Sequence, residues 1–333
     1  MKQKEVKYLL ALQLFANPNT QTTGSEGMTD EMKTFYNDTL IDLAGPKLVY
    51  DQFADKYPIP KNGGKTIEFR KYDNLGAATT PLTEGVTPDG DKLNVTTITA
   101  TVDQYGNYIT LSDMLIMTAV DNNVVQATKR LGEQAGKTGD CITRDVVCGG
   151  SNVYFPNGKT SRSALEITDI MTVALVMEGA AFLRTMDAPT INGDYVCILH
   201  PQVEKDIKKD PDWKECVKYS AAERIFEGEI GYYDGVRFVS STNAKIWKSS
   251  EDDCPDGLGV FGTMLVGAGA YATTQVEGGG LQVIVKQLGS GDDPLNQRAT
   301  VGWKLTKVAE RLVEQYMVRF ETCSSWSAAA QAN

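Results

Sequence analysis

Lys65-Thr-Ile-Glu-Phe-Arg-Lys-Tyr72 and Val95-Thr-Thr-Ile-Thr-Ala-Thr-Val102 are two stretches in which apolar and polar side chains alternate. A period of two is typical of β-strands with one covered and one exposed face. The connection between them, 73–94, is rich in Thr, Pro and Gly, and a connection of this length in a compact domain is usually functional. An isolated two-stranded ribbon is marginally stable in water, so we expect an extended arm that needs a partner surface. The candidate contact residues at its tip are Thr79, Thr80, Pro81, Thr83, Gly85, Pro88 and Gly90.

The longest helical pattern follows the arm and runs over 121–148. Apolar residues recur at spacings of three and four, which predicts one buried stripe. Its members are Val124, Ala127, Leu131, Ala135, Ile142 and Val146. At a rise of 1.5 Å per residue, this helix would be roughly 40 Å long. A shorter helical pattern is predicted over 29–43.

Helix and strand signals are mixed in the rest of the chain. The pattern predicts a strand over 195–200 that Pro201 ends, with a helix beginning at that proline. Further strands are predicted over 236–240, 258–271, 281–288, 300–309 and 314–322. The Ser- and Ala-rich tail after Cys323 is expected to be loosely held. This intermixing favours an α+β fold.

The composition excludes several functional classes. The 333 residues include 33 Lys and Arg against 43 Asp and Glu, which gives a net charge of −10 and argues against a site that grips nucleic-acid phosphates. No stretch is long and apolar enough for a transmembrane helix, so no membrane partner is expected. The length suggests two domains, or one large domain with extensions.

Six cysteines are spread irregularly along the chain. No Cys-x-x-Cys pair is present, so neither a zinc ribbon nor a redox motif is expected. Six in a chain of this size are too few for a disulfide scaffold, and we expect reduced thiols in a cytoplasm. They are Cys141, Cys148, Cys197, Cys216, Cys254 and Cys323.

The remaining motifs do not predict catalysis, a metal or a cofactor. Gly257-Leu-Gly-Val-Phe-Gly262 has the letters of a dinucleotide fingerprint but precedes a strand-like run, and Gly64-Lys-Thr66 lacks the first glycine of a phosphate-binding loop. Cys197 and His200 would lie on opposite faces of one strand. The acidic runs at 251–253 and 292–293 lack calcium-loop spacing. We therefore expect a protein that is not an enzyme.

The first sixteen residues imitate a secretory signal, with a basic start and a short apolar run. Glu5 and Gln13 interrupt this pattern, and Leu14 is bulky for the position it would occupy before a cleavage site at Ala16. A short helix that docks on a partner is the preferred interpretation. A secreted or surface β-rich adhesion module is the alternative.

Six short sequence motifs follow one another along the chain. They are Pro58-Ile-Pro-Lys-Asn-Gly-Gly-Lys-Thr-Ile-Glu-Phe-Arg70, Thr79-Thr-Pro-Leu-Thr-Glu-Gly-Val-Thr-Pro88, Ile98-Thr-Ala-Thr-Val-Asp-Gln-Tyr-Gly106, Ile109-Thr-Leu-Ser-Asp113, Phe226-Glu-Gly-Glu-Ile-Gly231 and Asn296-Gln-Arg-Ala-Thr-Val-Gly-Trp-Lys304. Together they resemble the major capsid protein of tailed bacteriophages, of the group with the HK97-like fold found in short-tailed and gut phages. The resemblance extends over about 34–321.

The resemblance implies an α+β, HK97-like fold with a definite order of parts. That order is an N-terminal arm (1–55), an extended β-hairpin loop that lies over the adjacent subunit (56–115), a peripheral domain with a long spine helix (116–160), an axial domain (161–274), the strands of the peripheral domain (275–323) and a C-terminal tail (324–333).

The function that the resemblance implies is structural. Copies of the chain would form the pentamers and hexamers of an icosahedral shell, assembled in the cytoplasm of a bacterial host, around double-stranded DNA held by loose contact. Other expected partners are portal, scaffold, and cement or head-fibre proteins. The adhesion module and a hydrolase using Cys197 or His200 remain the alternatives.

Overall fold

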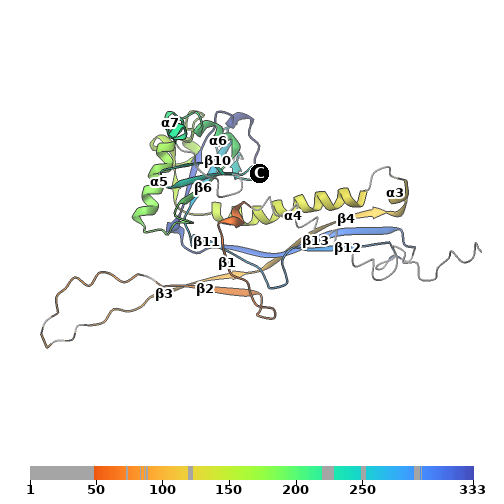
Figure 1. The fold of residues 1–333 in the computed structure, drawn as a ribbon, viewed down its shortest axis with the longest axis horizontal. Helices are drawn as coiled ribbons and strands as arrows, with labels where there is room; N and C mark the ends of the chain where they lie inside the picture. The colour runs from red at the N-terminus through yellow and green to blue at the C-terminus, as the bar shows by residue number, and fades with distance from the viewer. Residues whose placement is uncertain are drawn as a thin grey trace, which may run out of the picture.

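The computed structural model describes residues 49–72, 74–82, 84–85, 87, 89–118, 123–219, 229–248, 253–288, 293 and 295–333. Within these ranges, Figure 1 shows a compact part at one end, an elongated part built on one long helix and a long sheet, and a ribbon that projects beyond both. The helix predicted over 29–43, most of the predicted N-terminal arm, and the tip residues Thr83 and Pro88 lie outside the described residues.

The elements keep the labels of Figure 1. The α-helices are α3 (Asp113–Thr118), α4 (Asn123–Cys148), α5 (Val173–Thr185), α6 (Pro201–Ile207) and α7 (Pro211–Tyr219). The 3-10 helices are η3 (Tyr50–Gln52), η4 (Pro156–Gly158), η5 (Arg162–Ala164), η7 (Glu314–Tyr316) and η8 (Ser327–Ala329). The strands are β1 (Asp55–Lys56), β2 (Thr66–Tyr72), β3 (Val95–Thr101), β4 (Asp103–Ser112), β5 (Val153–Tyr154), β6 (Tyr195–Leu199), β7 (Glu229–Tyr233), β8 (Val236–Ser240), β9 (Ile246–Trp247), β10 (Val260–Val266), β11 (Tyr271–Thr274), β12 (Gln282–Lys286), β13 (Arg298–Arg311) and β14 (Met317–Thr322).

The projecting ribbon consists of β2 and β3, as the alternating sequence predicts. The strands pair antiparallel from Thr66 opposite Thr101 to Tyr72 opposite Val95 and form a separate two-stranded sheet. One face of the ribbon is partly covered by Tyr57, which makes an edge contact with Phe69 at 5.5 Å between ring centroids. The strand predictions over 65–72 and 95–102 are therefore confirmed.

The elongated part is a five-stranded sheet covered by α4 (Figure 1). β13 is its central strand and pairs antiparallel with β4, β12 and β11. Leu131 and Ala135 of α4 pack on Val301 and Trp303 of β13, and apolar side chains of β4 and β12 surround them. The sheet thus presents one face to the helix.

The prediction of the long helix is confirmed, but the stripe predicted along its second half is wrong. Ile142 and Val146 are only half-buried, and so is Val124 at the start of the helix. The buried face there contains Asp140, Thr143, Arg144, Val147 and Cys148. The reason is that this half of α4 packs against polar partners from distant segments, and hydrophobicity alone does not mark the contact face.

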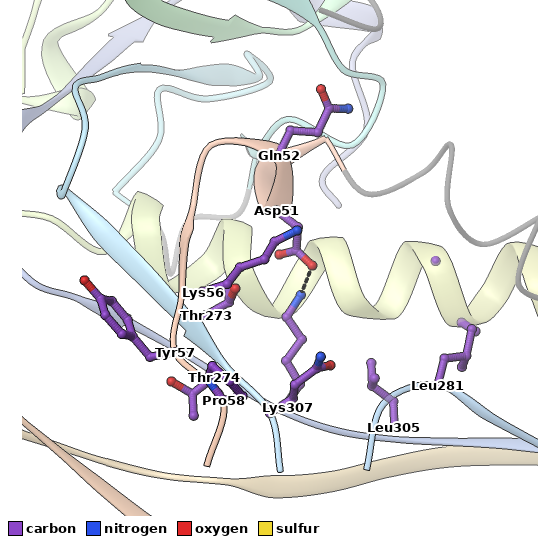
Figure 2. A pocket seen from close by; sticks show the side chains of 13 residues that line it. Asp51, Gln52, Lys56, Tyr57, Pro58, Thr273, Thr274, Leu281, Leu305 and Lys307 are labelled. Atoms are coloured by element: carbon purple, nitrogen blue, oxygen red, sulfur yellow. Dashed lines mark hydrogen bonds and ion pairs between the residues drawn. The ribbon is translucent and has the colours of Figure 1, made fainter. Parts of the chain in front are cut away.

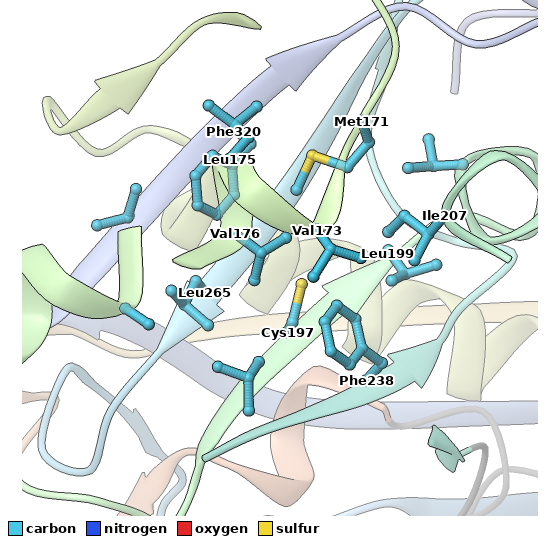
Figure 3. Packing of buried hydrophobic residues seen from close by; sticks show 14 of the residues in the cluster. Met171, Val173, Leu175, Val176, Cys197, Leu199, Ile207, Phe238, Leu265 and Phe320 are labelled. Atoms are coloured by element: carbon cyan, nitrogen blue, oxygen red, sulfur yellow. The ribbon is translucent and has the colours of Figure 1, made fainter. Parts of the chain in front are cut away.

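The compact part is a seven-stranded sheet with α5, α6 and α7 packed around it. β10 is at its centre, with β14 and β6 as antiparallel neighbours. Figure 3 shows the core between the sheet and α5, where Val176 meets Cys197, Leu265 and Phe320. The strand predicted over 258–271 is in fact two: β10 belongs to this sheet, while β11 belongs to the sheet of the elongated part.

The C-terminal tail is held, which contradicts the expectation of a loose one. Ser324 and Ser327 are completely buried. Asp206 of α6 accepts hydrogen bonds from the backbone N–H and the hydroxyl of Ser325, each at 2.8 Å. The Asn333 side chain accepts from the Ile246 N–H at 3.0 Å. Polar contacts of this kind leave no hydrophobic pattern in a sequence.

Candidate functional site

The loop beyond the ribbon is the first candidate, because it has no core of its own. Past the Tyr72–Val95 pair its two limbs separate, and the described residues between 74 and 94 are all exposed. Between those residues the one backbone–backbone hydrogen bond runs from the Thr79 N–H to the Ala77 carbonyl, at 3.0 Å. The backbone groups of the limbs are therefore available to water or to another chain.

The predicted tip residues fall on this exposed loop. Thr79, Thr80, Pro81, Gly85 and Gly90 are all exposed. The loop also carries three exposed leucines that the sequence analysis did not single out; they are Leu75, Leu82 and Leu93. Large apolar side chains gathered on a segment without a core mark a surface that associates with something else.

A cavity of about 470 Å³ lies between α4, η3 and the sheet. Figure 2 shows that Lys307 reaches from β13 to Asp51 at its wall. The Lys307 ammonium donates to Asp51 at 2.5 Å and to the Gly139 carbonyl at 2.9 Å, and the Thr143 hydroxyl donates to Asp51 at 2.6 Å. These bonds join η3, α4 and β13, so the cavity wall is a structural junction.

A second polar group on the same turns of α4 joins the helix to the compact part. Asp140 accepts a hydrogen bond from the Tyr50 N–H at 2.9 Å and one from the Asn243 amide at 2.8 Å. Arg144 donates to the Asn243 carbonyl at 2.9 Å. Burial raises the pKa of the Asp140 carboxyl, and it also raises the pKa of the Tyr50 hydroxyl beside it.

No pattern in the sequence marks this junction. Lys307 and Asp51 are 256 residues apart, and neither lies in a recognisable motif. The pairing of β13 with β11 and the packing of α4 bring them together.

The residues weighed for hydrolysis do not form a nucleophile and base. The Cys197 thiol is completely buried in the core of the compact part, and burial raises its pKa, so it is a thiol without access to substrate. His200 caps α6: its Nδ1 accepts the Gln202 N–H at 3.2 Å, and its ring lies 5.2 Å from that of Phe261. Burial lowers the pKa of His200.

The other motifs also have structural positions. Gly262 lies within β10 rather than at the start of a helix, where a dinucleotide would need it. Within the described ranges no group of three His, Cys, Asp or Glu side chains is placed to hold a metal ion. No helix in the described part of the chain is long and apolar enough to cross a membrane.

Comparison with known families decides between the alternatives. A family described as phage capsid protein matches residues 52–288, which is more than two thirds of the chain. The chain belongs to this family. Its capsid identity agrees with the resemblance found in the sequence strings, and nothing in the comparisons supports the adhesion module.

Solved capsids share the fold of this capsid protein. The capsid of Ralstonia phage GP4 is 14% identical with a TM-score of 0.64, and the match covers 82% of this chain and 87% of that one. The capsid of Helicobacter pylori bacteriophage KHP30 is 12% identical, with a TM-score of 0.57 and coverage of 80% and 88%. A virus-like particle from Pyrococcus furiosus is 10% identical, with a TM-score of 0.51 and coverage of 87% and 99%.

The fold is therefore of the HK97-like type, as expected, and the chain is a structural major capsid protein. No curated protein sequence matches the chain.

Proposed function

We propose that copies of this capsid protein close into an icosahedral shell around the double-stranded DNA of a tailed phage, and that the loop 74–94 lies over a neighbouring subunit. The observation that carries the proposal is the loop itself. It is exposed along its described length, it lacks internal pairing, and it carries apolar side chains that its own chain does not cover. A neighbouring copy would supply the missing core.

The parts of the structure fit roles in such a shell. The compact part would be the axial domain, which meets its copies in pentamers and hexamers, and the elongated part with α4 would be the peripheral domain with its spine helix. Association would then bury apolar surface and add strands across subunits, without chemical turnover. The partners proposed besides the chain itself are portal, scaffold, and cement or head-fibre proteins.

The negative net charge of the chain is compatible with a shell that encloses DNA. A net charge of −10 does not favour tight binding of phosphates, so packaged DNA would be held by loose, non-specific contact. We place assembly in the cytoplasm of the bacterial host and the finished protein in the virion.

The proposed shell function is tested by looking for assembled particles. The full chain, expressed in bacteria, is examined by sedimentation and negative-stain electron microscopy. Shells, capsomers or large oligomers are expected. A small monomer that persists at high concentration contradicts the proposal.

The role of the loop is tested by deleting 74–90 and joining the ends with a short Gly-Ser linker. The deletion removes a segment outside all three sheets, and its described residues are exposed, so we expect a soluble subunit with an unchanged circular dichroism spectrum that no longer closes shells. Normal shells from this variant would contradict the assigned role.

A further inference from the structure

The segment 324–333 lies along one edge of the compact part, and Figure 1 shows the C-terminal end of the chain beside that part. β9 forms this edge where it pairs with β10. In that pairing the Gly262 N–H donates to the Lys245 carbonyl at 2.9 Å. Because the backbone groups of successive residues in an antiparallel strand point to opposite sides, those of Ile246 point away from β10. Outward N–H and C=O groups of this kind are a template for pairing with another chain.

Asn333 occupies that edge. Its side-chain Oδ1 accepts a hydrogen bond from the Ile246 N–H at 3.0 Å, and its backbone N–H donates to the Ile246 carbonyl at 3.4 Å. Its side-chain Nδ2 donates to the Ala244 carbonyl at 3.0 Å. Asn333 thus pairs with both outward backbone groups of Ile246, in the way that the next strand of a sheet would.

The same segment covers the start of β10. The Gly259 N–H donates to the Ser327 carbonyl at 2.9 Å. Ala330 is only 2% exposed and belongs to the hydrophobic core of the compact part, together with Ile246 and Phe261. A Cβ on Gly259 would meet the Ala330 Cβ at 2.8 Å and the Ser327 carbonyl oxygen at 3.3 Å. The glycine therefore makes the space that the segment fills.

Two lysines hold the rest of the segment. The Lys248 ammonium donates to the carbonyls of Ala328 at 3.0 Å and of Ala330 at 2.6 Å. The Lys205 ammonium lies 3.8 Å from the centre of the Trp326 ring, which is a cation–π distance. Together with the hydrogen bonds to α6 described above, these contacts fasten the segment to α6 and to the end of β9 at once.

We propose that the segment 324–333 is an edge guard: it keeps a strand from a second copy of this chain from pairing with β9. The backbone groups that Asn333 covers on Ile246 are the ones that such a strand would use. The segment follows β14 directly, and a segment tethered this closely has an effective concentration of about millimolar at its site, above that of micromolar free subunits. The edge guard adds a control to the proposed shell function, since it confines association to other surfaces.

Deleting 324–333 tests the edge guard. The deletion frees the backbone groups of Ile246, so we expect irregular aggregates that grow with protein concentration and a yield of closed shells at least about tenfold below that of the full chain. Sedimentation and negative-stain electron microscopy measure both. A synthetic peptide of residues 324–333 in excess is expected to suppress the aggregates. The same peptide with Ala330→Asp, whose side chain does not fit the space at Gly259, should not suppress them.

A full-length variant displaces the segment without deleting it. Gly259→Val places a side chain where Ala330 lies, so limited proteolysis should show the segment released, and the same aggregates should form. The matched control is Gly257→Asn. Gly257 has a φ of +72°, which asparagine tolerates, and a Cβ there meets no atom within 4 Å, so this variant should behave as the wild type does.

Hydrogen exchange of the aggregates locates the contact. The Ile246 N–H should exchange slowly, because a strand of another copy accepts its hydrogen bond, and rapid exchange there overturns the proposal. Dispersed subunits or normal shells after release of the segment also overturn it. If the truncated chain does not fold by circular dichroism, Gly259→Val and Asp206→Ala carry the test with the same measurements. Absence of shells from the wild type contradicts the shell function, while the comparison of aggregates with and without the segment still decides the edge guard.

Discussion

Replacing Lys307 by methionine tests the polar junction that joins η3, α4 and β13. Methionine keeps most of the aliphatic stem and removes the ammonium group, which donates to Asp51 at 2.5 Å and to the Gly139 carbonyl at 2.9 Å. Lys307 is only 5% exposed, so water replaces these donors poorly. Removing one partner of a buried ion pair costs about 3–5 kcal/mol, and we expect the free energy of unfolding to fall by this amount. Asp51 keeps the Thr143 hydroxyl at 2.6 Å, which favours the lower end of that range.

The double variant Asp51→Asn with Lys307→Met is the control. It removes both charges, and because exchanging a buried ion pair for uncharged groups is often nearly neutral, we expect most of the loss to be recovered. The assay is urea unfolding of the unassembled subunit, followed by tryptophan fluorescence and circular dichroism. A loss below about 1 kcal/mol for the single variant, the range of a surface ion pair, would refute the junction. A double variant less stable than the single one would also refute it.

Three further changes have defined outcomes. Leu131 lies between α4 and β13 and is 2% exposed, so Leu131→Asp should abolish folding. Val124→Asp, at the half-buried start of α4, should leave a folded subunit. Circular dichroism of both variants is the measurement, and a folded Leu131→Asp subunit would contradict the packing. Gly302→Val should destabilise the subunit by about 1–3 kcal/mol in urea unfolding, because its side chain would meet Tyr108 on the paired strand β4. An unchanged midpoint would contradict this close approach of the two strands. Burial alone would raise the pKa of Asp206, but its hydrogen bonds from Ser325 and Lys209 outweigh burial and lower it. The hydrogen bonds from Ser325 to Asp206 thus stabilise the bound tail above the ordinary carboxyl pKa, and this stability is lost as pH falls through the lowered pKa of the folded state. Limited proteolysis across that pH range should show that acid releases the tail. Asp206→Ala should release the tail at neutral pH.

Much of the arm and of the long helix could be predicted because their signals are local. Alternation over 65–72 and 95–102 produced the two strands at their observed positions. The same reasoning failed in the second half of α4, where Thr143 and Arg144 are buried and Ile142 is not. Burial there follows hydrogen bonding to η3 and Asn243, and a hydrophobic pattern does not encode it.

The candidate site divides in the same way. The exposed loop follows from composition, since a Thr-, Pro- and Gly-rich connection has little to bury. The polar junction at the cavity wall does not, because Asp51, Thr143 and Lys307 become neighbours only when η3, α4 and β13 pack together. None of these three residues lies in a recognisable sequence motif.

The sequence by itself therefore determined the helices and strands whose apolar residues recur at a regular short spacing, and it determined the α+β class. Six sequence motifs also determined the capsid family. The tertiary structure decided that β4 joins β13 rather than the ribbon, that β11 leaves the sheet of β10, and that the tail is tied to Asp206. The physical reason is the separation along the chain between the residues that interact. A period of two or 3.6 residues is written in neighbouring positions, whereas strand partners and buried ion pairs depend on chain closure over one to three hundred residues.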